Sequence, residues 1–313
     1  MKKFLISVIG PTGSGKTGFA LELAKHFPIE IVNADIGQMY RPFTIGVAQP
    51  TDQEKRICSH HLFQFILEPA DFCVAEYRQR VGKLIEEIWL RGAIPVIVGG
   101  STFYQQALFF EQAVGISSQL RCRSDNTFSD AFSNHTALWE QLHLFDPVRA
   151  AAIHPNDSYR LRRALEIWHA TGKKPSSFAP KFSPLASQGI AIFLRLPREV
   201  LYERINQRTH EMLQLGWLEE VADLPEDWRH FAQRKGLIGY YELEQMLADK
   251  QPIETTISAI QQQTRNYAKR QETFFRKLNR ELARYKWPEA CICDLTLSNL
   301  NLYIKQIKSM YES

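Results

Sequence analysis

Short apolar runs alternate with amphipathic stretches over the first 110 residues. The runs Phe4–Ile9, Ile29–Val32 and Ala93–Val98 have the length and composition of buried strands. Between them, Lys16–His26 and Val74–Arg91 carry apolar residues at helical spacing. Alternation of strands and helices is typical of a parallel sheet, because each crossover helix returns the chain to the same edge. We therefore expect a parallel sheet with helices on both faces.

The pattern changes after about residue 115. Residues 115–134 are polar and lack a period, whereas His135–Phe145 is again helical in pattern. The segment HPND at 154–157 is a helix start with Asn156 or Asp157 as its N-cap, and Gly172 ends that helix. A connector rich in proline and serine follows over 173–189.

A strand-like run resumes at Ile190–Leu196, so the sheet is expected to continue there. The region before it then reads as a helical insertion. In the last long helix, apolar and aromatic residues recur at three- and four-residue steps and are expected to face the core: Ile257, Ile260, Thr264, Tyr267, Gln271, Phe274 and Leu278.

A glycine-rich loop lies between the first strand and the first helix. Its sequence GPTGSGKT matches the P-loop pattern, in which backbone N–H groups surround phosphate oxygens at a helix N-terminus. The predicted diphosphate-binding residues are Gly10, Pro11, Thr12, Gly13, Ser14, Gly15, Lys16 and Thr17. Lys16 adds a positive charge, and the Thr17 hydroxyl is a candidate ligand of Mg²⁺.

These observations predict an α/β fold: a P-loop NTPase-like parallel sheet core with helices on both faces, plus a helical insertion domain. The expected boundaries are 1–114 for the first part of the core and 115–189 for the insertion. Residues 190–313 would form the second part of the core with the C-terminal helices.

Hydrolytic P-loop enzymes carry, besides the loop, an apolar strand that ends in an acidic residue. In this sequence the strand IPVIVGG ends in Gly99-Gly100 without a carboxylate. Asp35, just past the second strand, is the best candidate, since the carboxyl ends of parallel strands share one edge. It could equally be a turn residue, because Asp is common at strand exits. His60 and His61 would point in different directions in a strand, which argues against a shared metal.

Positive charge is concentrated in two segments of a chain whose formal charge is only +4 over 313 residues. Residues 265–286 contain eight Lys and Arg against two acids. Arg160, Arg162, Arg163, Lys173 and Lys174 form a second cluster. Both clusters suit a nucleic-acid backbone, and both are also compatible with an ordinary solvated face.

Cysteine usage and hydropathy bear on location. The five cysteines include no CxxC pair, which favours a reducing, cytoplasmic setting. No apolar stretch approaches the roughly 20 residues of a membrane helix, so we expect no membrane association.

Motifs spread over residues 10–280 resemble those of the tRNA dimethylallyltransferases, also called tRNA isopentenyltransferases. The correspondence comprises GPTGSGKT at 10–17, NADIGQMY at 33–40, IGVAQP at 45–50, HHL at 60–62, VAEY at 74–77, IVGGSTFY at 97–104, HPNDSYRLRRALE at 154–166, TGKKPS at 171–176, RINQR at 204–208, IGYYEL at 238–243 and TRNYAKRQETFFR at 264–276. Motifs in this order and spacing are far more specific than a P-loop alone.

The resemblance implies a function for most of these positions. The loop would hold dimethylallyl diphosphate, with Mg²⁺ at Thr17. Asp35 would be the general base, Ser101 would stand beside the reacting adenine, and Arg208 would support the diphosphate. The residues implied in tRNA binding are Asp35, Ile36, Gly37, Gln38, Ser101, Tyr159, Arg160, Leu161, Arg162, Arg163, Gly236, Leu237, Ile238, Gly239, Tyr240 and Lys269.

The implied reaction moves a dimethylallyl group to the exocyclic amine of the adenosine 3′ of the anticodon, in tRNAs that read codons beginning with U. The partners would be the tRNA anticodon stem-loop, gripped in part by the insertion, and dimethylallyl diphosphate. We expect a monomer.

The chain departs from the usual family pattern at a few positions near the expected site. They are Ile36, Pro42, Val47, Gln49, Gln64 and Ser101-Thr102. Three alternatives follow: a small-molecule kinase that binds ATP in the same loop, an adenylate isopentenyltransferase that acts on a free nucleotide, and a tRNA-binding protein whose chemistry has lapsed.

Overall fold

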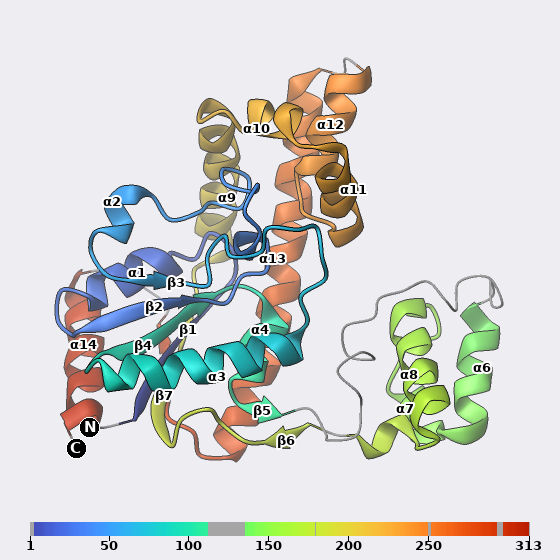
Figure 1. Cartoon of the computed structure of the whole chain (residues 1–313), viewed down its shortest axis with the longest axis horizontal. Coiled ribbons are helices and arrows are strands. Elements are labelled where there is room, and N and C mark those ends of the chain that lie inside the picture. The colour runs from blue at the N-terminus through green and yellow to red at the C-terminus, as the bar shows by residue number, and fades with distance from the viewer. Residues whose placement is uncertain (1–2, 112–134, 179, 250–251, 293–296, 313) are drawn as a thin grey trace. The chain divides into compact units, whose positions relative to one another are not determined.

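The computed structural model describes residues 3–111, 135–178, 180–249, 252–292 and 297–312. These form two compact units (Figure 1). The first comprises Met1–Ala70, Val81–Gln106 and Leu185–Ser313, and the second comprises Asp71–Arg80 and Ala107–Pro184. Within the described ranges, no helix is long and apolar enough to cross a membrane.

A six-stranded parallel sheet forms the centre of the first unit. Its strand order is β3-β2-β4-β1-β7-β8, and every neighbouring pair is parallel. The strands are β1 (Phe4–Ile9), β2 (Ile29–Asn33), β3 (His60–His61), β4 (Ile94–Gly99), β7 (Gln188–Leu194) and β8 (Glu289–Ile292). The carboxyl ends of β1, β2 and β4 therefore lie at one edge, which brings the P-loop, Asp35 and Gly100 together.

Helices cover both faces of the sheet, as the alternation predicted. Alternate residues of β1 point to opposite faces. Phe4, Ile6 and Val8 pack with α1 (Lys16–Leu23) and with Ile304 and Ile307 of α14 (Leu297–Glu312). On the other face, the hydroxyl of Ser7 donates to Gln105 of α4 (Thr102–Ala107) at 2.7 Å.

A helical cap rises from the same unit (Figure 1, upper part). It comprises α10 (Trp217–Asp223), α11 (Glu226–Lys235), α12 (Tyr240–Asp249) and the first turns of α13 (Ile253–Arg284). Its core is largely aromatic and contains Trp217, Trp228, Phe231 and Tyr240. Two residues from the loop after β2, Tyr40 and Phe43, complete it. At 32 residues, α13 runs about 48 Å and links this cap to the sheet.

Shorter elements and one further long helix complete the first unit. They are η1 (Gly37–Met39), α2 (Asp52–Lys55) and α9 (Arg198–Gln214). Leu201 and Ile205 of α9 pack against Ala268 of α13, so the two helices run together. Helix α3 (Val74–Leu90) begins in the second unit and ends in the first.

The second unit is small and mainly helical. It holds α6 (His135–Phe145), α7 (Pro147–Ala151), α8 (Ser158–Thr171), η3 (Pro175–Ser177) and the antiparallel pair β5 (Phe110–Glu111) and β6 (Lys181–Phe182). Its core contains Leu138, Leu142 and Leu161. Asp157 is the N-cap of α8, and Gly172 ends that helix with a left-handed conformation. The predicted polar stretch 115–134 lies outside the described residues.

Two features of the first unit differ from the sequence expectation. Strand β8 was not predicted, because its four residues carry no clear alternation. The buried face of α13 is also displaced: Phe275 is buried, whereas Ile257, Tyr267 and Phe274 are only partly buried. The helix meets the cap, α9 and the sheet in turn, so no single stripe describes its whole length.

Two Gly→Ala substitutions should change the free energy of unfolding in opposite directions. The first lies where β4 packs closely on the turn after β2. A Cβ added at Gly99 would lie 2.2 Å from the carbonyl carbon and oxygen of Ala34, so Gly99→Ala should lower the free energy of unfolding by about 2 kcal/mol or more. A Cβ added at Gly82 in α3 would lie 3.6 Å from a Leu185 methyl, which is ordinary van der Waals contact. Gly82→Ala should therefore raise the free energy of unfolding by about 0.5–1 kcal/mol.

Urea denaturation of both variants measures these changes. A Gly99→Ala protein as stable as the wild type would contradict the close approach of the two strand ends.

Candidate active site

The loop 10–17 adopts the conformation of a phosphate cradle. Gly13 and Gly15 have φ of 80° and 87°, which side chains other than glycine rarely adopt. The N–H of Ser14 donates to the Pro11 carbonyl at 3.2 Å and closes the turn. The Ser14 hydroxyl is buried and has no hydrogen-bond partner among the residues that the structure describes. The first N–H groups of α1 have no acceptor within the helix, so they are available to an anion.

Lys16 lies against this loop. Its ammonium donates to the Pro11 carbonyl at 2.8 Å. Burial lowers the pKa of Lys16 to about 8, while nearby Asp35 opposes the shift. A phosphate group in the cradle would add negative charge and strengthen the protonated form.

Asp35 is positioned by the residue two places before it. The Asn33 side chain is fully buried, accepts from the Asp35 N–H at 2.8 Å and donates to the carbonyls of Asp35 and Leu62, both at 3.0 Å. This turn brings the chain out of β2, and the carboxylate then accepts from the Gly37 N–H at 3.2 Å. The sequence left open whether Asp35 is a turn residue or a residue of the site. It is both, because it forms this turn and also lines the cavity described below.

The electrostatic surroundings of Asp35 make its carboxylate a better proton acceptor than an ordinary Asp. Burial raises the pKa of Asp35, and Lys16, Arg208 and N–H groups of Gly37 and Gly100 oppose that rise. Arg208 comes from α9, and burial in turn lowers its pKa against the attraction of Asp35. Lys16, Asp35 and Arg208 are thus electrostatically coupled, although they come from three separate parts of the chain.

Ser101 supports the turn that carries Asp35. Its hydroxyl accepts from the Ile36 N–H at 3.0 Å, and its own N–H donates to the Ala34 carbonyl at 3.1 Å. Ser101 does not line the cavity described next.

A cavity of about 1150 Å³ joins these groups. Its wall includes five of the predicted loop residues, Thr12, Gly13, Gly15, Lys16 and Thr17, and also Asp35, Ile36, Gly37, Gln38 and Arg208. The other three predicted loop residues, Gly10, Pro11 and Ser14, are buried. The opposite wall is more apolar and includes Met212, Trp217, Leu237, Ile238 and Ile260.

Gln38 and Gln49 fasten the loop that borders the cavity. The Gln38 amide donates to the carbonyls of Val47 and Ala48 at 3.1 and 2.6 Å. The Gln49 amide donates to the carbonyls of Gln38 and Phe43 at 2.9 and 3.1 Å. Because both Gln38 hydrogens are committed, what this side chain offers a ligand is its oxygen, a hydrogen-bond acceptor.

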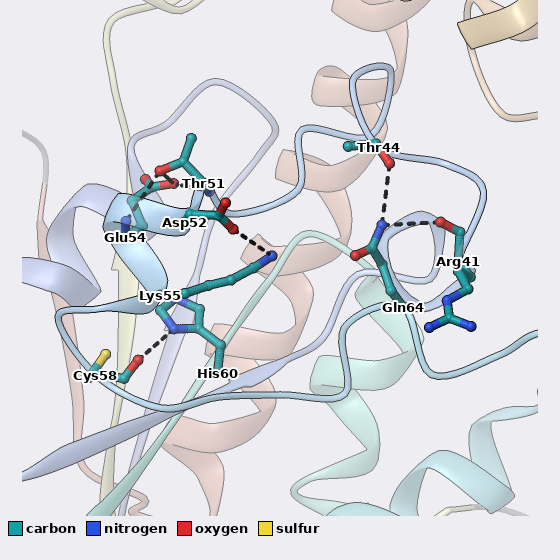
Figure 2. Close-up of polar contacts among 9 residues, drawn as sticks. All are labelled: Arg41, Thr44, Thr51, Asp52, Glu54, Lys55, Cys58, His60 and Gln64. Atoms are coloured by element: carbon teal, nitrogen blue, oxygen red, sulfur yellow. Dashed lines mark hydrogen bonds and ion pairs between the residues drawn. The ribbon is translucent and has the colours of Figure 1, made fainter.

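Gln64, another departure from the family pattern, ties the start of the same loop. Figure 2 shows its amide between Arg41 and Thr44, donating to the Arg41 carbonyl at 3.1 Å and to the Thr44 hydroxyl at 3.3 Å. In the same view, Thr51 and Glu54 form a capping box at α2. Gln49 and Gln64, two of the positions that depart from the family pattern, therefore still hold this loop through neutral amide side chains.

Glu220 of α10 anchors the loop from the cap. Its carboxylate accepts from the N–H groups of Thr44, Ile45 and Gly46 at 3.0, 2.6 and 3.3 Å. The Tyr240 hydroxyl also donates to it, at 2.7 Å. Tyr240, implied in tRNA binding, is only 2% exposed and serves here to hold Glu220.

The neighbouring turn 236–239 packs closely on the cap. Gly236, Leu237 and Ile238 line the cavity. Gly239 does not line it, and a Cβ there would lie 2.1 Å from the Trp217 ring. Its role in the described structure is therefore close packing.

The implied tRNA residues of the second unit are not equivalent. Tyr159 is 73% exposed, and Arg160 is exposed and paired with Asp157 at 3.3 Å. Arg162 is half-buried, and Arg163 pairs with Glu166 at 2.8 Å. The side chain of Leu161 is fully buried in the unit's core, so the predicted contact of Leu161 with tRNA would have to come from its backbone.

The long helix α13 brings residues that sequence reasoning did not assign to the site. Tyr267 and Arg270 line the cavity, and Gln271 contacts the P-loop. Their spacing on one helix beside the basic residue Lys269, which is exposed, was the available signal. It was not decisive, because the same spacing describes any core-facing stripe.

Comparison with known proteins agrees with this geometry. Residues 38–278 match the family model described as IPP transferase. The chain is 37% identical to the tRNA dimethylallyltransferase of Oceanobacillus iheyensis over 288 residues, covering 89% of this chain and 90% of the relative. It is 38% identical to that of Bacillus velezensis, covering 88% of each.

Two solved structures are also similar. The tRNA isopentenylpyrophosphate transferase of Bacillus halodurans matches with a TM-score of 0.65 and 30% identity, covering 99% of this chain and 97% of the other. A eukaryotic dimethylallyltransferase acting on tRNA matches with a TM-score of 0.79 and 27% identity, covering 98% and 78%. Sequence, fold and the joint placement of the P-loop and Asp35 lead to one conclusion: the chain belongs to the IPP transferase family.

Proposed function

We propose that this protein is a tRNA dimethylallyltransferase, which moves a dimethylallyl group from dimethylallyl diphosphate to the exocyclic amine of the adenosine 3′ of the anticodon. The observation that carries the proposal is the shared cavity of a P-loop and a partly buried carboxylate, Asp35, whose pKa is raised. The relatives bear the name of this activity, and one similar structure is of an enzyme acting on tRNA.

The leaving group is the part of the substrate that the cradle fits. In the transfer, the bond between the allylic carbon and the diphosphate oxygen breaks, and negative charge grows on the diphosphate. N–H groups of the loop, Lys16 and Arg208 would stabilise that charge in a site shielded from water. The more apolar opposite wall suits the hydrocarbon tail.

The incoming amine needs a base, because an aromatic amine is a weak nucleophile. As its nitrogen bonds to the allylic carbon, Asp35 would take one of its protons, and its raised pKa suits that task. The Gln38 oxygen is an acceptor for the second N–H of the same amine. The target base must leave its stack to enter the cavity.

The donor set at the loop is compatible with Mg²⁺. Thr17 lines the cavity, and its side chain is exposed there. Among the residues that the structure describes, no group of three or more His, Cys, Asp or Glu could hold a metal ion. The ion would therefore take one hydroxyl from Thr17 and its other ligands from diphosphate and water, as Mg²⁺ commonly does. It would supply charge neutralisation of the leaving group.

For tRNA itself, exposed basic residues are available on both units. Arg160 in α8 and Lys269 in α13 are the strongest candidates for phosphate contacts, because neither is buried. Monomeric state and cytoplasmic location remain predictions from the sequence.

A small-molecule kinase is the principal rival, since kinases also bind through a P-loop. Isothermal titration with dimethylallyl diphosphate and with ATP separates the two. Tight binding of ATP together with phosphate transfer from it, and no incorporation of the prenyl group into tRNA, would overturn the proposed function.

Replacing the base should remove catalysis without removing substrate binding. We expect Asp35→Asn to lower kcat about 100- to 10,000-fold, the range that general bases contribute, while tRNA affinity stays within about twofold. Asp52→Asn is the matched control, because Asp52 is an exposed carboxylate outside the cavity. Single-turnover transfer of labelled prenyl group measures the first effect, and filter binding measures the second. An equal loss of tRNA binding would contradict the role of Asp35.

The pKa of Lys16 predicts an alkaline limit for the reaction. Lys16 must be protonated to bind the diphosphate, so kcat/KM for the donor should fall as pH rises above about 8. It should also fall as pH drops through the raised pKa of Asp35, because the protonated carboxyl accepts no proton. In Lys16→Arg, which stays charged, the alkaline limb should disappear even though the rate is lower. Persistence of that limb would assign it to another group.

Phosphate contacts by basic residues should be visible in the salt dependence of tRNA binding. Arg160→Ala and Lys269→Ala should each weaken binding and reduce the slope of log K against log salt by about one. Lys308→Ala is a suitable control, because Lys308 pairs with Glu312 in α14. If the Arg160 and Lys269 variants keep the wild-type slope, these side chains do not contact phosphate.

A further inference from the structure

A buried glutamine in α13 connects the phosphate loop to the end of β4. Gln271 is 1% exposed. Its amide oxygen accepts from the Thr12 N–H at 2.9 Å. Its amide nitrogen donates to the Gly100 carbonyl at 2.7 Å. One side chain thus binds the main chain of two loops that are nearly 90 positions apart in the sequence.

Gln271 also acts on Tyr267, which lies four residues earlier in α13. It lowers the pKa of the Tyr267 hydroxyl, against the rise caused by burial. Tyr267 itself lines the cavity. From its place in α13, Gln271 thus contacts two loops that border the cavity, the phosphate loop and the end of β4.

The contact with Gly100 leads directly to Asp35. The backbone N–H of Gly100 lowers the pKa of the Asp35 carboxyl, and the Gly100 carbonyl accepts from the Gln271 amide at 2.7 Å. A Cβ at residue 100 would lie 2.4 Å from the Gln271 nitrogen and 3.6 Å from an Asp35 carboxylate oxygen. The three groups are therefore in close contact, and a side chain at Gly100 would displace Gln271.

We propose that Gln271 is a positioning residue that sets the distance between the diphosphate cradle and the Asp35 carboxylate. This inference rests on the proposed function, because it assigns those two groups to the leaving diphosphate and to the base. Transfer requires the allylic carbon, whose diphosphate the loop holds, to meet the amine that Asp35 holds. A displacement of about 1 Å between the two can cost about 100-fold in rate.

The simpler interpretation is that Gln271 only satisfies buried polar groups. The protein contains a matched example of that role. Gln105 is also fully buried, accepts from the Ser7 hydroxyl at 2.7 Å and donates to the Gly99 carbonyl at 3.2 Å. Among the described residues, its hydrogen bonds go to Ser7, Val8 and Gly99, and none goes to the P-loop or to Gly100. Comparison of the two glutamines separates positioning from burial.

The first test compares Gln271→Met with Gln105→Met, because methionine is similar in length and shape to glutamine but has no amide. We expect similar losses of thermal stability, because each leaves buried polar groups unpaired. We expect kcat to fall about 30- to 100-fold in Gln271→Met and by less than about threefold in Gln105→Met. Equal kcat values in the two variants would overturn the positioning role.

A second readout follows the state of Asp35. Lys16, Arg208 and Tyr267 also face Asp35 and are unchanged in the variant. If Gly100 shifts and its hydrogen bond to the carboxylate weakens, the pKa of Asp35 rises further. The acid limb of kcat/KM should then move to higher pH in Gln271→Met but not in Gln105→Met. An unmoved limb in Gln271→Met counts against the inference.

Two further arms keep the inference testable. Gln271→Asn retains the amide but is one methylene too short to span Thr12 and Gly100, so we expect the same changes with less loss of stability. Hydrogen exchange of the segment 10–17 should be faster in both Gln271 variants than in Gln105→Met. If the wild type transfers no prenyl group, the proposed function fails, whereas unchanged exchange in the Gln271 variants refutes the inference itself.

Discussion

The site depends on the burial of three ionisable side chains around one cavity. A buried charge is costly unless it is paired, and Lys16, Asp35 and Arg208 offset part of that cost for one another. When all three are ionised, two positive charges face one negative charge, so positive charge is left over. In the proposed function, a diphosphate would supply the missing negative charge, so one arrangement would both attract the donor and hold a carboxylate ready as a base. The pKa shifts of Lys16 and Asp35 come mainly from burial, which the attraction between the two groups offsets only in part.

Steric limits on the main chain keep that arrangement in place. Gly99 admits Ala34 at a distance that no side chain would allow, and Gly100 does the same for Gln271. The carboxyl ends of β2 and β4 are therefore held together, with Asn33 and Ser101 completing the turn that carries Asp35. The helix α13 reaches both the aromatic cap and the P-loop, so packing in the cap and geometry at the cradle are physically connected.

The departures from the family pattern are compatible with an intact site. Gln49, within the loop 44–50, donates its amide to the carbonyls of Gln38 and Phe43. Gln64 donates to the Arg41 carbonyl and the Thr44 hydroxyl, and Glu220 anchors the same loop from α10. Gln38 keeps its oxygen for a ligand because Val47 and Ala48 accept from its nitrogen through backbone atoms. A backbone acceptor does not depend on which side chain residue 47 carries, so the change at that position leaves the contact unaltered.

The sequence by itself determined the local elements and the chemistry of the loop. Glycines at 13 and 15 can take positive φ, apolar runs form the strands, and the Asp157 cap and Gly172 bound a helix, all from interactions between near neighbours in the chain. It also placed Asp35 at a strand exit and, through motifs in a specific order, indicated the family. Only the tertiary structure decided which distant groups meet. Arg208 approaches Asp35, Glu220 holds residues 44–46, and Gln271 joins Thr12 to Gly100. These contacts join positions about 170 to 260 residues apart, and no local pattern encodes them, because they depend on how whole helices pack against the sheet.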